Sequence, residues 1–199
     1  MKVTVIADTH SLFSKMLEKN IGIIDKIKNT DLIILLGDHS VGDIRTLERT
    51  FYDMPKIGVL GNHDTEYTYF ETTIDNIHKK QVYVNKLSFI GFQGSTRYKA
   101  GQKIGFGQEE SVEIGMNLPP ADILICHDAP YGYEGNVSDV AHCGMKGILT
   151  YIQHKAPKIV LYGHHHHNKW YKIDNTNCLC VYGIQIFEID DKTVEIKYL

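Results

Sequence analysis

Short apolar runs alternate with longer mixed segments over most of the chain. Each run is too short for a typical helix and ends in glycine or polar residues, which favours a buried strand. We therefore predict strands at 2–8, 31–38, 56–64, 79–85, 86–94, 121–128 and 158–166. Helical patterns lie between them at 11–29, 41–51, 109–117 and 145–155. The alternation is typical of βαβ units.

The first helical pattern is the clearest, because Phe13, Leu17, Ile24 and Ile27 recur on one helical stripe. Ser11 precedes this stripe and is a good candidate for the N-cap of a helix over 11–29.

Two segments depart from the alternation. The glycine-rich stretch 94–107 has too little apolar content to pack as an element, so it is predicted to be a long loop, which in many proteins is functional. The tail after 168 contains β-rich runs at 169–173, 178–189 and 193–199 with no helix between them. The whole pattern predicts one α/β domain over 1–199, with a mixed or two-sheet core flanked by helices.

Composition is ordinary for a soluble globular protein, with 43% hydrophobic and 23% charged residues in 199. No apolar run approaches the roughly 20 residues that cross a bilayer. The N-terminal stretch enters a strand directly, without a signal-peptide pattern, so a cytoplasmic location is expected. The four cysteines form no zinc-finger spacing and are expected to be reduced, partly buried thiols. The net charge of −3 gives no reason to expect a nucleic-acid backbone as the main partner.

Polar residues of the metal-ligating types follow several of the predicted strands. In open α/β sheets, ligands bind beyond the carboxyl ends of the strands, so these side chains are expected to converge although they are far apart in sequence. They are Asp8, His10, Asp38, Asn62, His63, Asp64, His127, His164 and His166.

The run of four histidines at 164–167 is the most unusual of these stretches. Where the backbone is still extended, side chains alternate, so His164 and His166 are expected on one side. His165 and His167 are then expected to face solvent or to lie behind the ligands. A fully solvated run is the alternative, and the other polar stretches argue against it.

The candidate ligands are imidazole, carboxylate and amide groups without thiolate, which suits divalent Mn, Fe, Co, Ni or Zn. Even without His63 and Asp64, the seven remaining side chains are too many for one tetrahedral zinc and about right for two ions that share a bridging carboxylate. With Asp8, Asp38 and a hydroxide, two such ions leave a site of net positive charge. Such a centre attracts phosphate and activates water.

Five short motifs occur in a fixed order: DTH at 8–10, GD at 37–38, GNHD at 61–64, CHD at 126–128 and GHHH at 163–166. Together they resemble the calcineurin-like metallophosphoesterase family, and in particular its compact, single-domain phosphodiesterase-like members. The resemblance covers residues 8 to 166. It implies a four-layer αββα sandwich with two mixed β-sheets flanked by helices.

The resemblance also implies roles for individual residues. The first metal would be held by Asp8, His10, Asp38 and His166, and the second by Asp38, Asn62, His127 and His164. His63 would stabilise the transition state and protonate the leaving oxygen, and Asp64 would orient its imidazole. Arg97, His142 and Asn62 would contact the substrate. A solvated position is the alternative for Arg97, and a surface or packing role for His142.

The implied activity is phosphodiester hydrolysis by attack of a metal-bridging hydroxide, with Mn²⁺ as the first candidate and Fe, Ni, Co or Zn as alternatives. The substrate would be a small phosphate ester, with nucleotides among the candidates. A phosphomonoesterase, a nuclease and a non-catalytic scaffold are the competing readings. The stretch GDHSVGD departs from the G-D-x-x-D-R-G motif of protein phosphatases, which disfavours that class.

Overall fold

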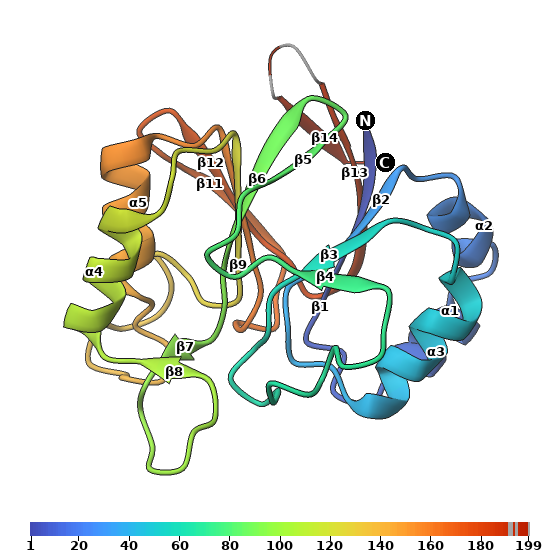
Figure 1. Ribbon diagram of the computed structural model, residues 1–199, viewed down its shortest axis with the longest axis horizontal. Coiled ribbons are helices and arrows are strands. Elements are labelled where there is room, and N and C mark those ends of the chain that lie inside the picture. Colours follow the sequence, from blue (N-terminus) through green and yellow to red (C-terminus); the bar gives the residue numbers. More distant parts are fainter. Residues whose placement is uncertain (191–192, 194, 199) are drawn as a thin grey trace.

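The computed structural model describes residues 1–190, 193 and 195–198, and it has four layers (Figure 1). Two six-stranded sheets lie face to face. Helices α1, α2 and α3 cover the outer face of one sheet, and α4 and α5 cover the outer face of the other (Figure 1). The predicted αββα sandwich is therefore confirmed. The helices are α1 (Phe13–Lys19), α2 (Ile23–Lys28), α3 (Val41–Phe51), α4 (Gln108–Asn117) and α5 (Lys146–Lys155).

Both sheets are mixed. The first has the order β14-β13-β1-β2-β3-β4, in which β1 to β4 run parallel and β13 is antiparallel to β1. Its strands are β1 (Lys2–Ala7), β2 (Leu32–Leu35), β3 (Lys56–Gly58), β4 (Ile74–Asn76), β13 (Gly183–Ile189) and β14 (Ile196–Tyr198).

The second sheet has the order β11-β12-β10-β9-β6-β5, with β12, β10, β9 and β6 parallel and an antiparallel strand at each edge. Its strands are β5 (Val82–Val84), β6 (Leu87–Phe92), β9 (Ile123–Cys126), β10 (Ile159–Tyr162), β11 (Lys169–Ile173) and β12 (Thr176–Cys180).

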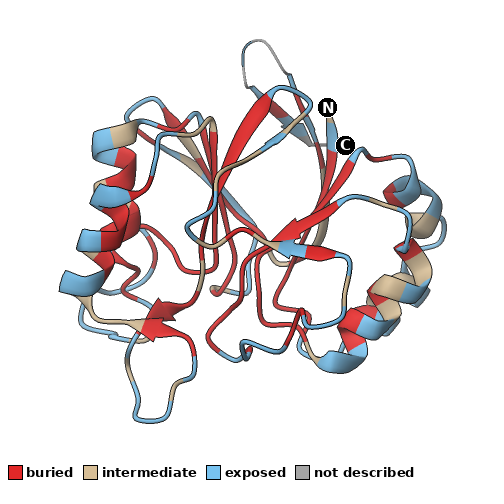
Figure 2. Ribbon diagram, viewed as in Figure 1, coloured by how far each residue is buried: buried red, intermediate tan, exposed pale blue. Residues whose placement is uncertain are grey.

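Three apolar clusters fill the spaces between the four layers. The central one joins the facing sides of the two sheets, with Val5, Ile34 and Leu161 among its buried members. The other two lie under α1–α3 and under α4–α5, so buried residues line both faces of each sheet (Figure 2). Burial on both faces explains why the central strands are continuous apolar runs rather than alternating ones.

The predicted helix over 11–29 is wrong in extent. Two short helices, α1 and α2, occupy the segment: α1 ends at Lys19, after which Asn20 leaves the helical conformation, and α2 begins after Gly22, which is left-handed with φ of 79°. Ser11 is not the N-cap. The start of α1 is held instead by the carboxylate of Asp43 on α3, which accepts hydrogen bonds from the N–H groups of Ser11 and Phe13 at 2.7 and 3.0 Å.

Three further differences concern strands. The run 178–189 is split between β12 and β13, which lie in different sheets. The predicted loop 94–107 is bounded by a short parallel pair, β7 (Ser95–Thr96) and β8 (Gly105–Phe106). Strand β4 was not predicted. The last predicted run, 193–199, contains β14, and its residues 194 and 199 lie outside the described part of the chain.

None of the helices in the described ranges has both the length and the apolar character needed to span a bilayer. All four cysteines are free and buried, more completely than the partly buried positions expected from the sequence.

Candidate metal centre

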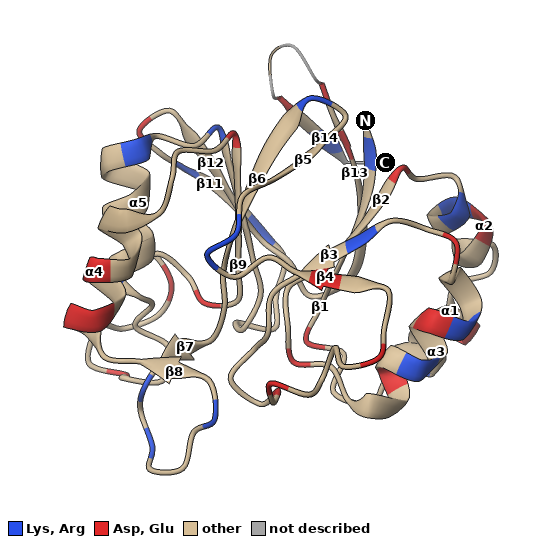
Figure 3. Ribbon diagram, viewed as in Figure 1, with Lys and Arg blue, Asp and Glu red and all other residues tan. Residues whose placement is uncertain are grey.

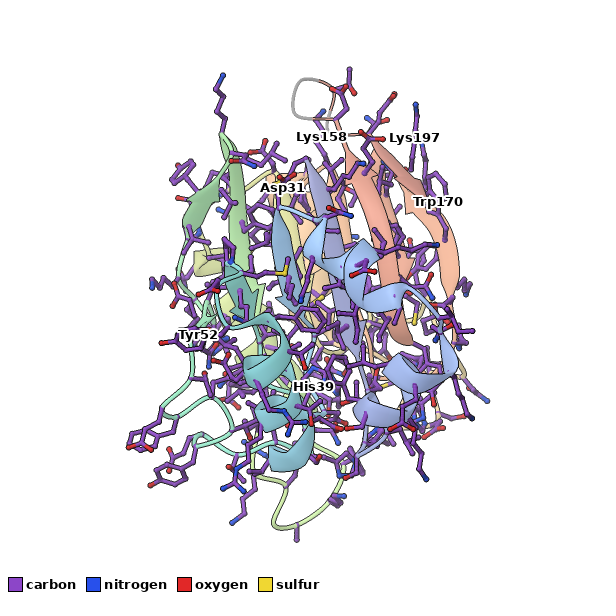
Figure 4. The ribbon with its side chains drawn as sticks, turned by 90° about the vertical axis from the view of Figure 1, so that its right-hand side faces the viewer. Asp31, His39, Tyr52, Lys158, Trp170 and Lys197 are labelled. Atoms are coloured by element: carbon purple, nitrogen blue, oxygen red, sulfur yellow. The ribbon has the colours of Figure 1, made fainter. Side chains whose placement is uncertain are left out.

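The parallel strands of both sheets end at the same edge of the sandwich, so the segments that follow them meet there (Figure 1). Acidic positions gather where β1, β2 and β3 end (Figure 3). In Figure 4, His39 lies at this edge, whereas Asp31 and Lys158, which precede β2 and β10, lie at the opposite one. The topology thus brings together residues that are up to 158 positions apart, such as Asp8 and His166.

Asp8, His10 and His166 form the first group of candidate metal ligands. The Nε2 atoms of His10 and His166 lie 3.1 Å apart, and Asp8 Oδ1 is 4.0 and 3.7 Å from them. Asp8 Oδ1 is buried without a hydrogen-bond partner among the described residues. Burial and the neighbouring Asp38 carboxylate raise the pKa of Asp8 well above its usual range. A cation between these three atoms would supply the partner that Asp8 lacks.

Asp38, His127 and His164 form the second group, and all three are buried. His127 Nδ1 lies 2.7 Å from the Leu36 carbonyl oxygen, to which it must donate. Burial lowers the pKa of His127 to about 4, so the ring is neutral and its Nε2 is an acceptor. This Nε2 nevertheless faces two other acceptors, Asp38 Oδ2 at 3.5 Å and Asn62 Oδ1 at 2.9 Å. Three acceptors that face one another fit a cation site.

The carboxylate of Asp38 lies between the two groups. Its Oδ2 is 3.8 Å from His10 Nε2 in the first group and 3.5 Å from His127 Nε2 in the second. Its other oxygen accepts a hydrogen bond of 2.8 Å from the backbone N–H of His63, which fixes the orientation of the carboxylate. The same oxygen, Oδ2, thereby lies within 4 Å of a candidate ligand nitrogen in each group.

His164 and His166 belong to different ligand groups, and the backbone that carries them is not a continuation of the strand. Strand β10 ends at Tyr162, and both residues have left-handed backbones, with φ of 69° and 52°. His164 Nε2 lies 2.8 Å from the Ala141 carbonyl oxygen, so it donates there and leaves Nδ1 free as an acceptor. The extended alternation predicted for 164–167 is therefore wrong.

His165 lies behind the candidate ligands, next to His164, whereas His167 contacts Glu134 instead. The His165 side chain is only 6% exposed, with Nε2 3.8 Å from the buried carboxylate of Asp128. His167 is exposed and lies 3.2 Å from Glu134. Glu134, His167 and Cys180 form a third close group. Lys169 already supplies a positive charge 3.2 Å from Glu134, and burial raises the pKa of Cys180, so this group does not resemble a metal site.

Asp64 stabilises the loops that carry the ligands. Its carboxylate accepts backbone N–H groups from Gly61 at 2.7 Å, Asp38 at 2.8 Å and His39 at 3.1 Å. Burial and the nearby Asp38 raise its pKa to about 7. Gly61 is required there because a Cβ atom would collide with Asp38. The hydrogen bonds of Asp64 thus go to the main chain, and orientation of the His63 ring by Asp64 stays a prediction.

The ring of His63 is exposed and packs edge-on against His10, with the ring centroids 5.7 Å apart. It borders a hollow of about 250 Å³ that His10, Asp38 and Asp64 also line. An imidazole in this position can exchange a proton with a group bound in the hollow.

The two predicted substrate contacts are placed differently. The ring of His142 lies 5.3 Å from that of His164, at the border of the second group, and its Nδ1 is 2.9 Å from Asp139. The guanidinium of Arg97 instead donates to the Gly105 carbonyl at 2.5 Å and lies 3.9 Å from Glu110. Arg97 is therefore directed along its own loop.

Sequence reasoning missed two residues near the ligands. The hydroxyl of Tyr98 accepts a hydrogen bond of 3.3 Å from Asn62 Nδ2, which directs Asn62 Oδ1 toward His127. Asp128 is buried and accepts the backbone N–H of Thr96 at 2.9 Å, so it ties the start of the Tyr98 loop to the end of β9. Asp128 could have been found from the CHD motif, whereas Tyr98 has no signal of its own.

Comparison with known proteins agrees with this geometry. The sequence model of the calcineurin-like phosphoesterase superfamily domain matches residues 1–183. A search of curated proteins gave no match. Among solved structures, TT1561 of Thermus thermophilus is 12% identical with a TM-score of 0.63, covering 98% of this chain and 96% of that one.

Two other solved structures of similar fold are of phosphoesterases. A structure described as a novel archaeal phosphodiesterase is 18% identical with a TM-score of 0.56, covering 100% of this chain and 99% of that one. A dimetal phosphatase from Danio rerio is 9% identical with a TM-score of 0.63, covering 94% and 92%. At these identities the likeness concerns the fold.

The chain belongs to the calcineurin-like phosphoesterase superfamily. The protein is accordingly a metal-dependent hydrolase of phosphoric esters.

Proposed function

We propose that the protein is a phosphodiesterase with a dinuclear metal centre. The observation that carries the proposal is the pair of ligand groups that share one oxygen of Asp38. Asp8, His10, His166 and Asp38 would hold one ion, and Asp38, Asn62, His127 and His164 the other. Two divalent ions in such a pair supply charge that attracts phosphoryl oxygens and a water nucleophile that is active near neutral pH. The nitrogen and oxygen ligands suit Mn²⁺, with Fe, Ni, Co or Zn as alternatives.

His63 would act as the general acid. Its ring is exposed at the hollow, while its backbone N–H holds Asp38, so it can protonate a leaving oxygen without being a ligand. Asn62 and His142 lie at the second group, next to His127 and His164, and would contact phosphate oxygens. Asp64 would act by fixing the backbone on which His63 is carried.

A diester is favoured over a monoester by the charge around the hollow. Among the described residues that line it there is no lysine or arginine, and Arg97 is engaged by Gly105 and Glu110. A phosphomonoester dianion needs more compensating charge than a diester monoanion, so a site with only the two ions suits the diester. The four buried thiols fit a reducing compartment, which supports a cytoplasmic location.

The test compares hydrolysis of bis(p-nitrophenyl) phosphate and p-nitrophenyl phosphate by metal-free protein before and after Mn²⁺ is supplied. We expect Mn²⁺ to restore hydrolysis and the diester to have the higher kcat/KM. Asp38→Asn should bind fewer than two ions and lose turnover. Asp174→Asn is a matched control, since Asp174 is exposed and has φ of 51°, close to the 59° of Asp38. Absence of product with every divalent ion would refute the proposal.

A further inference from the structure

A second hollow, of about 650 Å³, lies beside the metal centre and has no role in the mechanism above. One wall is the segment 65–67, which directly follows Asp64. The other is the loop 97–106, whose Tyr98 is hydrogen-bonded to Asn62. Both segments lie at the end of the sandwich where the parallel strands terminate (Figure 1). We call this space the side hollow; its walls include Leu60, Thr65, Tyr67, Ile104 and Phe106.

The charges of the side hollow are balanced. Arg97 and Lys103 line it together with Glu66 and Glu110, so the two positive and two negative groups cancel. Such a space does not attract a second phosphate. It suits an uncharged organic group with polar edges, and its volume lies within the range of small-molecule sites.

An exposed aromatic ring stands at the border of the side hollow. Tyr67 is 69% exposed and its ring packs only at an angle against Phe70, with centroids 6.4 Å apart. Phe106 lines the same space and is held by an edge contact with Phe92 at 5.8 Å. Aromatic rings at an open site provide stacking surfaces for flat ligands such as nucleobases.

From these observations we propose that the side hollow binds an uncharged, nucleoside-sized ester group of the substrate, with its base against Tyr67. The phosphoryl group would then lie at the metal centre, which the segment 61–65 joins to the hollow. This inference rests on the proposed function, because it assigns the hollow to the ester group of the same substrate. Binding of the nucleoside in the side hollow makes the enzyme selective for nucleoside phosphodiesters over phosphodiesters of small alcohols.

Binding can be measured without catalysis, using two phosphonates whose P–C bond an esterase does not cleave. The probes are 5′-deoxyadenosine 5′-phosphonate and methylphosphonate, titrated calorimetrically into the Mn²⁺-loaded protein. We expect the nucleoside phosphonate to bind roughly 5- to 150-fold more tightly, since stacking of a base contributes about 1–3 kcal/mol. Tyr67→Ala should remove most of this preference. Equal dissociation constants for the two probes would overturn the proposal.

Tyr52→Ala is the matched control. Tyr52 (labelled in Figure 4) is 65% exposed and lines a different hollow, over α3, to which Tyr67 also contributes. We expect Tyr52→Ala to keep the full preference. A loss equal to that of Tyr67→Ala would place the base over α3 and refute the side hollow.

Hydrolysis of methyl p-nitrophenyl phosphate by the same samples separates the two proposals. If this diester is hydrolysed but the phosphonates bind equally, only the side hollow is refuted. If the nucleoside phosphonate is preferred but no diester is hydrolysed, the proposed function fails and the ester-group assignment fails with it.

Discussion

Replacement of His63 by alanine tests the division between ligands and acid in the metal centre. The backbone N–H that holds Asp38 at 2.8 Å is kept in the variant. The ring itself is exposed, and in the part of the chain that the structure describes its ring contact is the edge of His10 at 5.7 Å. Since little packing is removed, the free energy of unfolding should change by no more than about 0.5 kcal/mol.

Turnover should fall much more than stability. A positioned general acid contributes about 10²–10⁴-fold to the rate, or about 3–5 kcal/mol of barrier. The fall should depend on the leaving group. The leaving group of a dinucleotide is a nucleoside alkoxide, which needs the proton. The leaving group of bis(p-nitrophenyl) phosphate is p-nitrophenolate, which leaves without one. We therefore expect a loss of about 10²–10⁴-fold in kcat for a dinucleotide and a clearly smaller loss for bis(p-nitrophenyl) phosphate.

The assay combines kcat for both substrates with metal analysis by mass spectrometry. His63→Ala should retain the metal content of the wild type, and His154→Ala, an exposed position on α5, should match the wild type in every measurement. Loss of metal together with turnover would show that His63 is a ligand. An equal loss of rate for both leaving groups would refute the role of proton donor.

Three further changes probe the surroundings of the ligands. Tyr98→Phe removes the partner of the Asn62 amide and should weaken binding of one metal ion by roughly tenfold in a calorimetric titration; unchanged affinity would refute the orienting role. Asp64→Ala leaves three backbone N–H groups without their acceptor, so urea unfolding should show a loss of at least about 3 kcal/mol, and a loss below about 1 kcal/mol would contradict it. Burial lowers the pKa of His78 from 6.5 to about 4, so the unfolded chain binds the proton first and stability falls as pH decreases below 6.5, by about 2 kcal/mol at pH 5. His78→Asn can still accept the N–H of Gln93 and should reduce this loss between pH 7.5 and pH 5 in urea unfolding; an unchanged loss would exclude His78 as its source.

The central strands could be predicted because burial on both faces makes them continuous apolar runs. Strand β4 could not, since its sequence is Ile-Asp-Asn and two of its three residues are unfavourable in strands. The break at Gly22 was missed because a single glycine is tolerated inside many helices, and its left-handed backbone depends on the tertiary fold. The split of 178–189 was missed because alternation is the same whether a strand stays in one sheet or crosses to another.

In the site, the motifs were sufficient to identify the residues that converge, but not the backbone that makes them converge. His164 and His166 reach separate groups through left-handed conformations, which no alternation rule contains. The positions of Arg97 and Tyr98 depend on how one loop folds. The sequence therefore favoured the charged Arg97, whereas the neighbouring Tyr98 is the residue that contacts Asn62.

The left-handed conformations have a consequence for engineering. Five candidate site residues have φ between 40° and 69°: Asp8, His10, Asp38, His164 and His166. In this region the backbone of a residue other than glycine is strained by up to about 1–3 kcal/mol. Selection for heat resistance alone, with turnover left unselected, should therefore enrich glycine and asparagine at the two exposed positions, His10 and His166, where no buried hydrogen bond among the described residues opposes the change. The most durable descendants of this enzyme would be its inactive ones.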